Sequence, residues 1–270
     1  MASGCSVQLL VVLVVVVASV IITTQGMKVV VATRLHLGKA TTPPADLEAK
    51  LVNFTRFCCG RPGVIAVDAA EKIPGYNLVD EIKRVCDKLS TDTLHVLPVQ
   101  PWGQVVPALN ACILYACDQH ADQILFVSAE TSAPESTISK LQSHLSSDTL
   151  VVGAALPGHD HGDGEMALNG RTCPWNTLAL WDLSKLALTG FQLVSDGCHD
   201  KSLAGIEEVV AIALLQTMVM RHGHPCKAKL VKVEGVEWNQ AFDDPARKAW
   251  HEHKMQSKIT RAAQQLELLG

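Results

Sequence analysis

The sequence predicts an α/β domain built on a doubly wound, mostly parallel sheet. From residue 27 onward, short apolar runs alternate with amphipathic stretches. Hydrophobic residues make up 48% of the 270-residue chain and aromatic residues only 4%, so Val, Leu, Ala and Ile dominate, which suits strands covered on both faces by helices. Because parallel neighbours need helical crossovers, the alternation favours a parallel sheet.

The first 26 residues are predicted to be an apolar leader outside this domain. The run at 7–22 is interrupted only by Gln8 and Ser19, and it is shorter than the roughly 20 residues that span a bilayer as a helix. It fits a signal-peptide core or a short signal anchor, which would place the protein in the secretory pathway or attach it to a membrane. If Met27 is the true start, the protein is cytoplasmic.

Five apolar runs bounded by polar residues predict the strands. The first is KVVVA, and the second, GVIAVD, ends at Asp68. The run QILFVSAE has the composition of the most central strand. The expected strands cover 28–32, 63–68, 94–99, 123–130 and 149–156.

Helical periodicity fills the intervals between these strands. Leu78, Ile82, Val85 and Leu89 follow the spacing of an amphipathic helix. The expected helices cover 43–57, 78–89, 105–119, 132–145 and 204–221. The glycine-rich stretch 158–164, which contains His159 and His161, predicts a solvated loop. The domain is expected to span 27–242, followed by a polar helical tail, 243–270, on the surface.

Several functional classes lack their sequence signals. The net charge of −4 and the absence of a basic stripe argue against a nucleic-acid partner. No GxGxxG follows the first strand, and neither GxxxxGK[ST] nor GxSxG occurs, which disfavours dehydrogenases, P-loop NTPases and α/β hydrolases. Nine cysteines leave two interpretations open, buried thiols or disulfides with one cysteine left over.

The order of the segments resembles the family 2 glycosyltransferases of the GT-A fold, a Rossmann-like nucleotide-sugar-binding fold, over about residues 28–238. The similarity rests on KVVVATR, VIAVDAAE, PWGQVVPALNACILYA, QILFVSAET, LNGRTCPWNTLALWDLSKLALTGF and GIEEVVAIALL. It implies binding of a nucleotide-diphosphate sugar near the carboxyl ends of the strands, where ligands of such sheets bind. The implied donor-binding residues are Thr33, Asp68, Gly103, Asn110, Ser128 and Glu130.

The family's Asp-x-Asp metal motif is replaced here by Ser128-Ala129-Glu130. The resemblance implies a divalent cation, Mn or Mg, held by Glu130 with phosphate and water. The substitution leaves a metal-independent or an inactive site as alternatives.

The resemblance also implies an acceptor side. Glu208 matches the carboxylate that deprotonates the acceptor hydroxyl, with Glu207 as the fallback. Trp175 and Asn176 match the loop that faces the acceptor. The sequence thus predicts a glycosyltransferase, inverting at the anomeric carbon, with an unknown acceptor. A catalytically inactive GT-A-like binding module is the alternative. A nucleotidyltransferase fits less well, because residues 33–39 supply a single glycine.

Overall fold

The computed structural model describes residues 26–197, 200, 202, 204–223, 225–239, 249, 252–253 and 255–269. The apolar leader lies almost entirely outside the described residues, so the predictions of a signal peptide, a membrane anchor and a secretory location stay predictions. Within the described residues, no helix is both long and apolar enough to cross a membrane.

A seven-stranded sheet forms the centre of the domain and confirms the predicted α/β class. Its spatial order is β3-β2-β1-β4-β7-β6-β8, and β7 alone in this sheet pairs antiparallel with its neighbours. The strands are β1 (Val29–Leu35), β2 (Gly63–Asp68), β3 (Leu94–Val99), β4 (Gln123–Val127), β6 (Thr149–Ala154), β7 (Leu178–Asp182) and β8 (Lys227–Val231). Two short strands, β5 (Thr131–Ser132) and β9 (Glu237–Trp238), pair separately.

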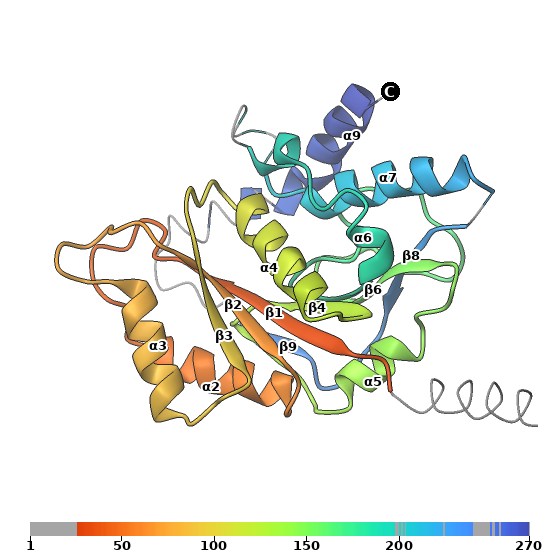
Figure 1. Ribbon diagram of the computed structural model, residues 1–270. Coiled ribbons are helices and arrows are strands. Elements are labelled where there is room, and N and C mark those ends of the chain that lie inside the picture. The colour runs from red at the N-terminus through yellow and green to blue at the C-terminus, as the bar shows by residue number, and fades with distance from the viewer. Residues whose placement is uncertain are drawn as a thin grey trace, which may run out of the picture.

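Helices cover both faces of the sheet (Figure 1). Right-handed crossovers that run in opposite directions from β1 place α2 and α3 together on one face and α4 on the other. The contacts agree, because α2 packs against α3 while α4 packs against α6. The helical elements are α2 (Leu47–Cys58), α3 (Leu78–Lys88), α4 (Val106–Asp118), α5 (Thr137–Gln142), α6 (Leu183–Leu186), η1 (Leu193–Asp196), α7 (Glu207–Met220) and α9 (Lys258–Leu269).

Strand pairing corrects the predicted end of the first strand. The sequence predicts an end at residue 32, but Thr33, Arg34 and Leu35 continue the parallel register with β2. Backbone pairing with a neighbour extends a strand beyond its apolar run, and the apolar pattern alone cannot reveal such a partner. Thr33 therefore lies inside the sheet, where it is 3% exposed.

The topology singles out one end of the sheet as the place for a ligand. From β1 the chain builds β2 and β3 on one side and then returns to β4 on the other. Ligands of open α/β sheets bind outside the carboxyl ends of the strands at such a reversal. The antiparallel β7 begins at this same end, because Leu178 pairs with Val127.

The tail differs from the predicted surface helix. The structure places a helix, α9, in this tail, where it packs against α7 (Figure 1). Lys258, Arg261 and Gln265 of α9 are buried, and the Gln265 amide donates to the carbonyl of Val194 at 3.0 Å. The polar composition of the tail predicted a solvated helix. Instead, one face of α9 packs on α7, because the apolar stems of its long polar side chains can be buried there.

Candidate functional site

Charged side chains gather where β1, β2 and β4 end. His36 follows β1 and lies within electrostatic range of Asp68 and Glu130 as well as of Arg34 and Lys72. Although His36 is exposed, the surrounding protein still desolvates its ring, and this effect, followed by the positive charges of Arg34 and Lys72, lowers the pKa of His36 to about 4. The imidazole is therefore neutral at pH 7, and the charges around it include two cations, Arg34 and Lys72, and two carboxylates, Asp68 and Glu130.

Asp68, the predicted contact to the nucleobase, ends β2 at this edge but is already engaged. It is 3% exposed, and its carboxylate pairs with the Lys72 ammonium at 2.5 Å. Its other oxygen accepts the backbone N–H of Ala70 at 3.1 Å. A bound nucleoside would share Asp68 with Lys72, and the base contact stays a prediction.

Glu130, the predicted metal ligand, has a partner on each carboxylate oxygen. The Ser128 hydroxyl donates to Oε2 at 2.5 Å, and the Lys50 ammonium lies 3.3 Å from Oε1. Burial favours the neutral acid, but the Ser128 hydrogen bond and the Lys50 charge outweigh it and lower the pKa of Glu130. The group is an ionised carboxylate at neutral pH.

These residues do not fit a dedicated divalent-cation site. Mg²⁺ and Mn²⁺ require several oxygen ligands that are free to face the ion. Both Glu130 oxygens are occupied, one of them by a positive ammonium that would repel a cation. Across the described parts of the chain, no group of three or more His, Cys, Asp or Glu residues could hold a metal ion.

Gly103 and Asn110 make interactions that hold the fold together. Gly103 has a φ of +64°, and a Cβ there would lie 2.7 Å from Oδ2 of Asp196. Asp196 accepts backbone N–H groups of Gln104 at 2.9 Å and of Val106 at 2.7 Å, which caps α4.

Asn110 links α4 to the backbone of Phe191 by two hydrogen bonds, of 2.9 and 2.8 Å. The buried Thr33 hydroxyl accepts or donates no hydrogen bond within the described residues. Gly103 and Asn110 thus make contacts that stabilise the fold. The donor-binding roles predicted for Thr33, Gly103 and Asn110 stay untested.

A second charged cluster surrounds the start of α7. Glu207 and Glu208 are 7% and 5% exposed, and Lys258 and Arg261 of α9 lie within electrostatic range of them. Burial, and next the Glu207 charge, raise the pKa of Glu208 to about 7, against the opposing effect of Lys258. A carboxyl group with this pKa can exchange a proton at neutral pH.

Trp175, predicted to face the acceptor, is only 2% exposed. The His159 ring lies against it at 3.7 Å between centroids, and the Lys258 ammonium lies 3.7 Å from the indole centroid. His159 is held by the backbone of Leu156 and Cys173, whereas a solvated loop was expected. In this conformation the indole presents no open face to a sugar, and its acceptor role stays a prediction.

A short path connects the two clusters. Glu208 accepts the backbone N–H of Asn176 at 2.7 Å. The next residue, Thr177, accepts the backbone N–H of Ser128 at 2.9 Å, and the Ser128 side chain bonds Glu130. The tertiary structure therefore brings Asn176, Ser128, Glu130 and Glu208, which the sequence spreads over some 80 positions, to one end of the sheet.

Sequence reasoning did not identify several charged or titratable residues at this end, among them His36, Lys50, Lys72 and Lys258. Lys72 follows Asp68 by four positions, but the segment between them is not helical, so the spacing rule for helical ion pairs did not apply. The other three reach the site only through packing of the loop after β1, of α2 and of α9, which local sequence does not reveal.

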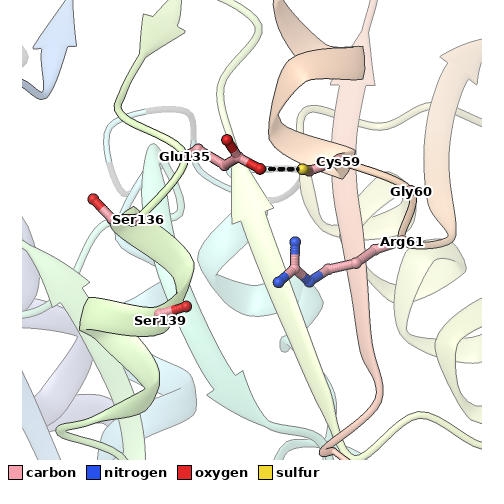
Figure 2. A pocket seen from close by; sticks show the side chains of 6 residues that line it. All are labelled: Cys59, Gly60, Arg61, Glu135, Ser136 and Ser139. Atoms are coloured by element: carbon pink, nitrogen blue, oxygen red, sulfur yellow. Dashed lines mark hydrogen bonds between the residues drawn. The ribbon is translucent and has the colours of Figure 1, made fainter.

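An open pocket of about 840 Å³ lies elsewhere, between the end of α2 and α5. Figure 2 shows Arg61 extending from the α2 side toward α5, and the Cys59 thiol bonded to Glu135 at 2.7 Å. This pocket borders the amino end of β2, whereas ligands of such sheets bind at the carboxyl ends. We therefore place the candidate site at the charged clusters. All seven described cysteines are free thiols.

No family model and no curated protein matches the sequence. Solved structures with a similar arrangement include 4-diphosphocytidyl-2C-methyl-D-erythritol synthase from Anaerococcus prevotii, with 12% identity and a TM-score of 0.48, covering 86% of this chain and 100% of that one. TarS of S. aureus in complex with UDP-GlcNAc has 13% identity and a TM-score of 0.40, over 60% of this chain and 47% of that one.

GalNAc-T7 with UDP, GalNAc and Mn²⁺ has 12% identity and a TM-score of 0.43, over 81% of this chain and 46% of that one. The chain thus spans about half the length of the TarS and GalNAc-T7 chains. With TM-scores this low, the likeness assigns neither a family nor an activity to this protein.

Proposed function

We propose that this protein is a glycosyltransferase that moves a sugar from a nucleotide-diphosphate sugar to an acceptor hydroxyl. The observation that carries the proposal is the position and titration of Glu208. It is a buried carboxyl group whose pKa is raised to about 7, and a short backbone path joins it to Ser128 and Glu130 at the topological reversal of the sheet.

In the proposed reaction, Glu208 accepts the proton of the acceptor hydroxyl as its oxygen attacks the anomeric carbon. The bond from that carbon to the diphosphate oxygen breaks, and the nucleoside diphosphate leaves with the bonding electrons. Attack opposite the leaving group inverts the anomeric centre. Asp68 would contact the nucleobase, and Glu130 and Ser128 would lie beside the diphosphate.

Turnover of a Glu208→Gln variant tests the base. The amide keeps the bond from Asn176 but accepts no proton, so we expect turnover to fall by about 10²- to 10⁴-fold with donor affinity nearly unchanged. The measurement is release of nucleoside diphosphate from a panel of UDP-, GDP- and CDP-sugars with sugar and peptide acceptors. Glu207→Gln is the comparison, and a wild-type rate in Glu208→Gln together with a loss of turnover in Glu207→Gln moves the role to Glu207.

Nucleotide binding tests the donor site separately. Asp68→Ala should weaken binding of a nucleoside diphosphate in calorimetry, whereas Asp87→Ala, an exposed aspartate on α3, should leave it unchanged. Equal affinities for all three proteins would contradict the placement of the base at Asp68. A protein that binds no UDP, GDP or CDP cannot have the proposed function.

A catalytically inactive binding module is the second candidate, and one observation favours it. Glu208 and Trp175 are both buried, with Lys258 of α9 over the indole ring, so the acceptor side is covered in this conformation. A wild-type protein that binds donor but transfers sugar to no acceptor in the panel would support the binding module.

A further inference from the structure

Lys50 occupies a fixed position beside Glu130. It lies in the first turns of α2, where its side chain is 25% exposed and its ammonium lies 3.1 Å from Asp46 and 3.3 Å from Glu130. One turn further on, the Asn53 amide donates to the carbonyl of Thr131 at 2.5 Å. These contacts dock α2 on the segment that follows β4, so the ammonium is held at the carboxyl end of the sheet.

The local charges keep Lys50 protonated. Partial burial opposes the charged form, but Glu130 and Asp46 outweigh this effect and raise the pKa of Lys50. The result is a protonated ammonium group between two carboxylates, one of which, Glu130, was expected to hold a metal. An ammonium group has three N–H donors and commonly binds phosphate as a point charge.

A divalent cation in this fold would stabilise the charge on the diphosphate of the donor and of the leaving group. The geometry points to Lys50, instead of a metal ion, as the source of the stabilising positive charge. We propose that Lys50 binds the donor diphosphate directly, held in place by Glu130, so that nucleotide binding requires no divalent cation. The inference rests on the proposed function, because it specifies how that same site holds its donor.

Calorimetric titration of the full chain with UDP and GDP, in EDTA and again with Mn²⁺, tests the inference. We expect the wild type to bind with the same affinity in both buffers. Lys50→Gln should bind about 10- to 100-fold more weakly, the range for loss of a hydrogen bond to a charged group. Lys50→Arg keeps the charge and should stay within a few-fold of the wild type.

Lys88→Gln is the matched control, since it removes an exposed lysine of α3 whose ammonium lies 2.7 Å from Glu48 of α2, in an ion pair that includes neither Lys50 nor Glu130. Its affinity should equal that of the wild type. Thermal unfolding of each variant shows that it is folded, so that weaker binding by Lys50→Gln reports on the site.

The outcomes separate the two proposals. Binding that depends on Mn²⁺ and is unaffected in Lys50→Gln would overturn the inference while leaving the glycosyltransferase proposal intact. Equal affinity of the wild type and Lys50→Gln in EDTA would also overturn it. If the wild type binds neither nucleotide in either buffer, the proposed function fails and the inference fails with it.

Discussion

Glu130 and Glu208 lie at the same end of the sheet, but their surroundings differ. The Glu130 side chain is 40% exposed and pairs with a partly exposed lysine, whereas Glu208 is 5% exposed among residues of α7, α9 and the segment before β7. Their pKa values move in opposite directions, down for Glu130 and up for Glu208. At Glu130 the Ser128 hydrogen bond and the Lys50 charge together outweigh desolvation, whereas at Glu208 desolvation and the Glu207 charge prevail.

This difference separates two chemical roles. A carboxylate that remains ionised at neutral pH can hold a cation in place, as Glu130 holds Lys50. A carboxyl group that titrates near neutrality can take up and release a proton, as the proposal requires of Glu208. The same residue type is thus suited to positioning in one cluster and to proton transfer in the other.

The largest effect on stability is expected when Lys258, the lysine beside Glu207 and Glu208, is removed. Lys258→Met leaves Glu207 and Glu208 buried with less compensating charge, and we expect a loss of about 3–5 kcal/mol in the free energy of unfolding at pH 8. At pH 5 the loss should be smaller, because Glu208 is then protonated. Urea unfolding at both pH values measures it, and a loss that does not depend on pH would show that Lys258 stabilises through packing alone.

Titration of Glu208 should make stability depend on pH. Its pKa is raised in the folded state, so between about pH 4.5 and 7 the folded protein holds a proton that the unfolded chain has released. Stability therefore falls as pH rises through this window, by an amount on the order of 3 kcal/mol. Glu208→Gln should lack this decrease, so its stability relative to the wild type should be greater at pH 8 than at pH 4. Identical pH profiles for the two proteins would contradict the raised pKa.

Gly103 sharpens the distinction between a binding and a structural role. Gly103→Ala places a Cβ against Asp196 at positive φ, and we expect destabilisation of about 1–2 kcal/mol. Chemical denaturation gives this value, and calorimetry with UDP gives the affinity of the folded variant. An unchanged stability with a lost affinity would restore the donor-binding role that the sequence predicted.

The smallest effect on the free energy of unfolding is expected for the partly exposed ion pair of Lys50 and Glu130. Lys50→Gln should change the free energy of unfolding by about 1 kcal/mol or less, because partly exposed ion pairs contribute little to stability. The same urea titrations compare it with Lys258→Met. A loss as large as that of Lys258→Met would mean that Lys50 serves the fold, which would weaken its assignment to the diphosphate.

The sequence predicted the parallel half of the sheet well. The second and third strands and the helix at 78–88 have nearly the predicted bounds, because buried parallel strands are continuous apolar runs and Leu78, Ile82 and Val85 form a helical stripe. Asn77 caps that helix with two hydrogen bonds from backbone N–H groups. The antiparallel β7 and the edge strand β8 were not predicted, since neither is marked by a repeat of the strand–helix pattern.

In the candidate site, too, some features follow from the sequence and others only from the tertiary structure. The sequence by itself determined that Asp68 ends a strand and that the pair Glu207-Glu208 begins a helix. Glu130, predicted to end the strand at 123–130, instead lies in a turn three residues beyond β4, which ends at Val127. Only the tertiary structure decided what surrounds them. Burial and charge partners come from α2 and α9, whose residues are distant in the chain, and these surroundings set whether a carboxyl group is ionised, paired with lysine or able to exchange a proton at neutral pH.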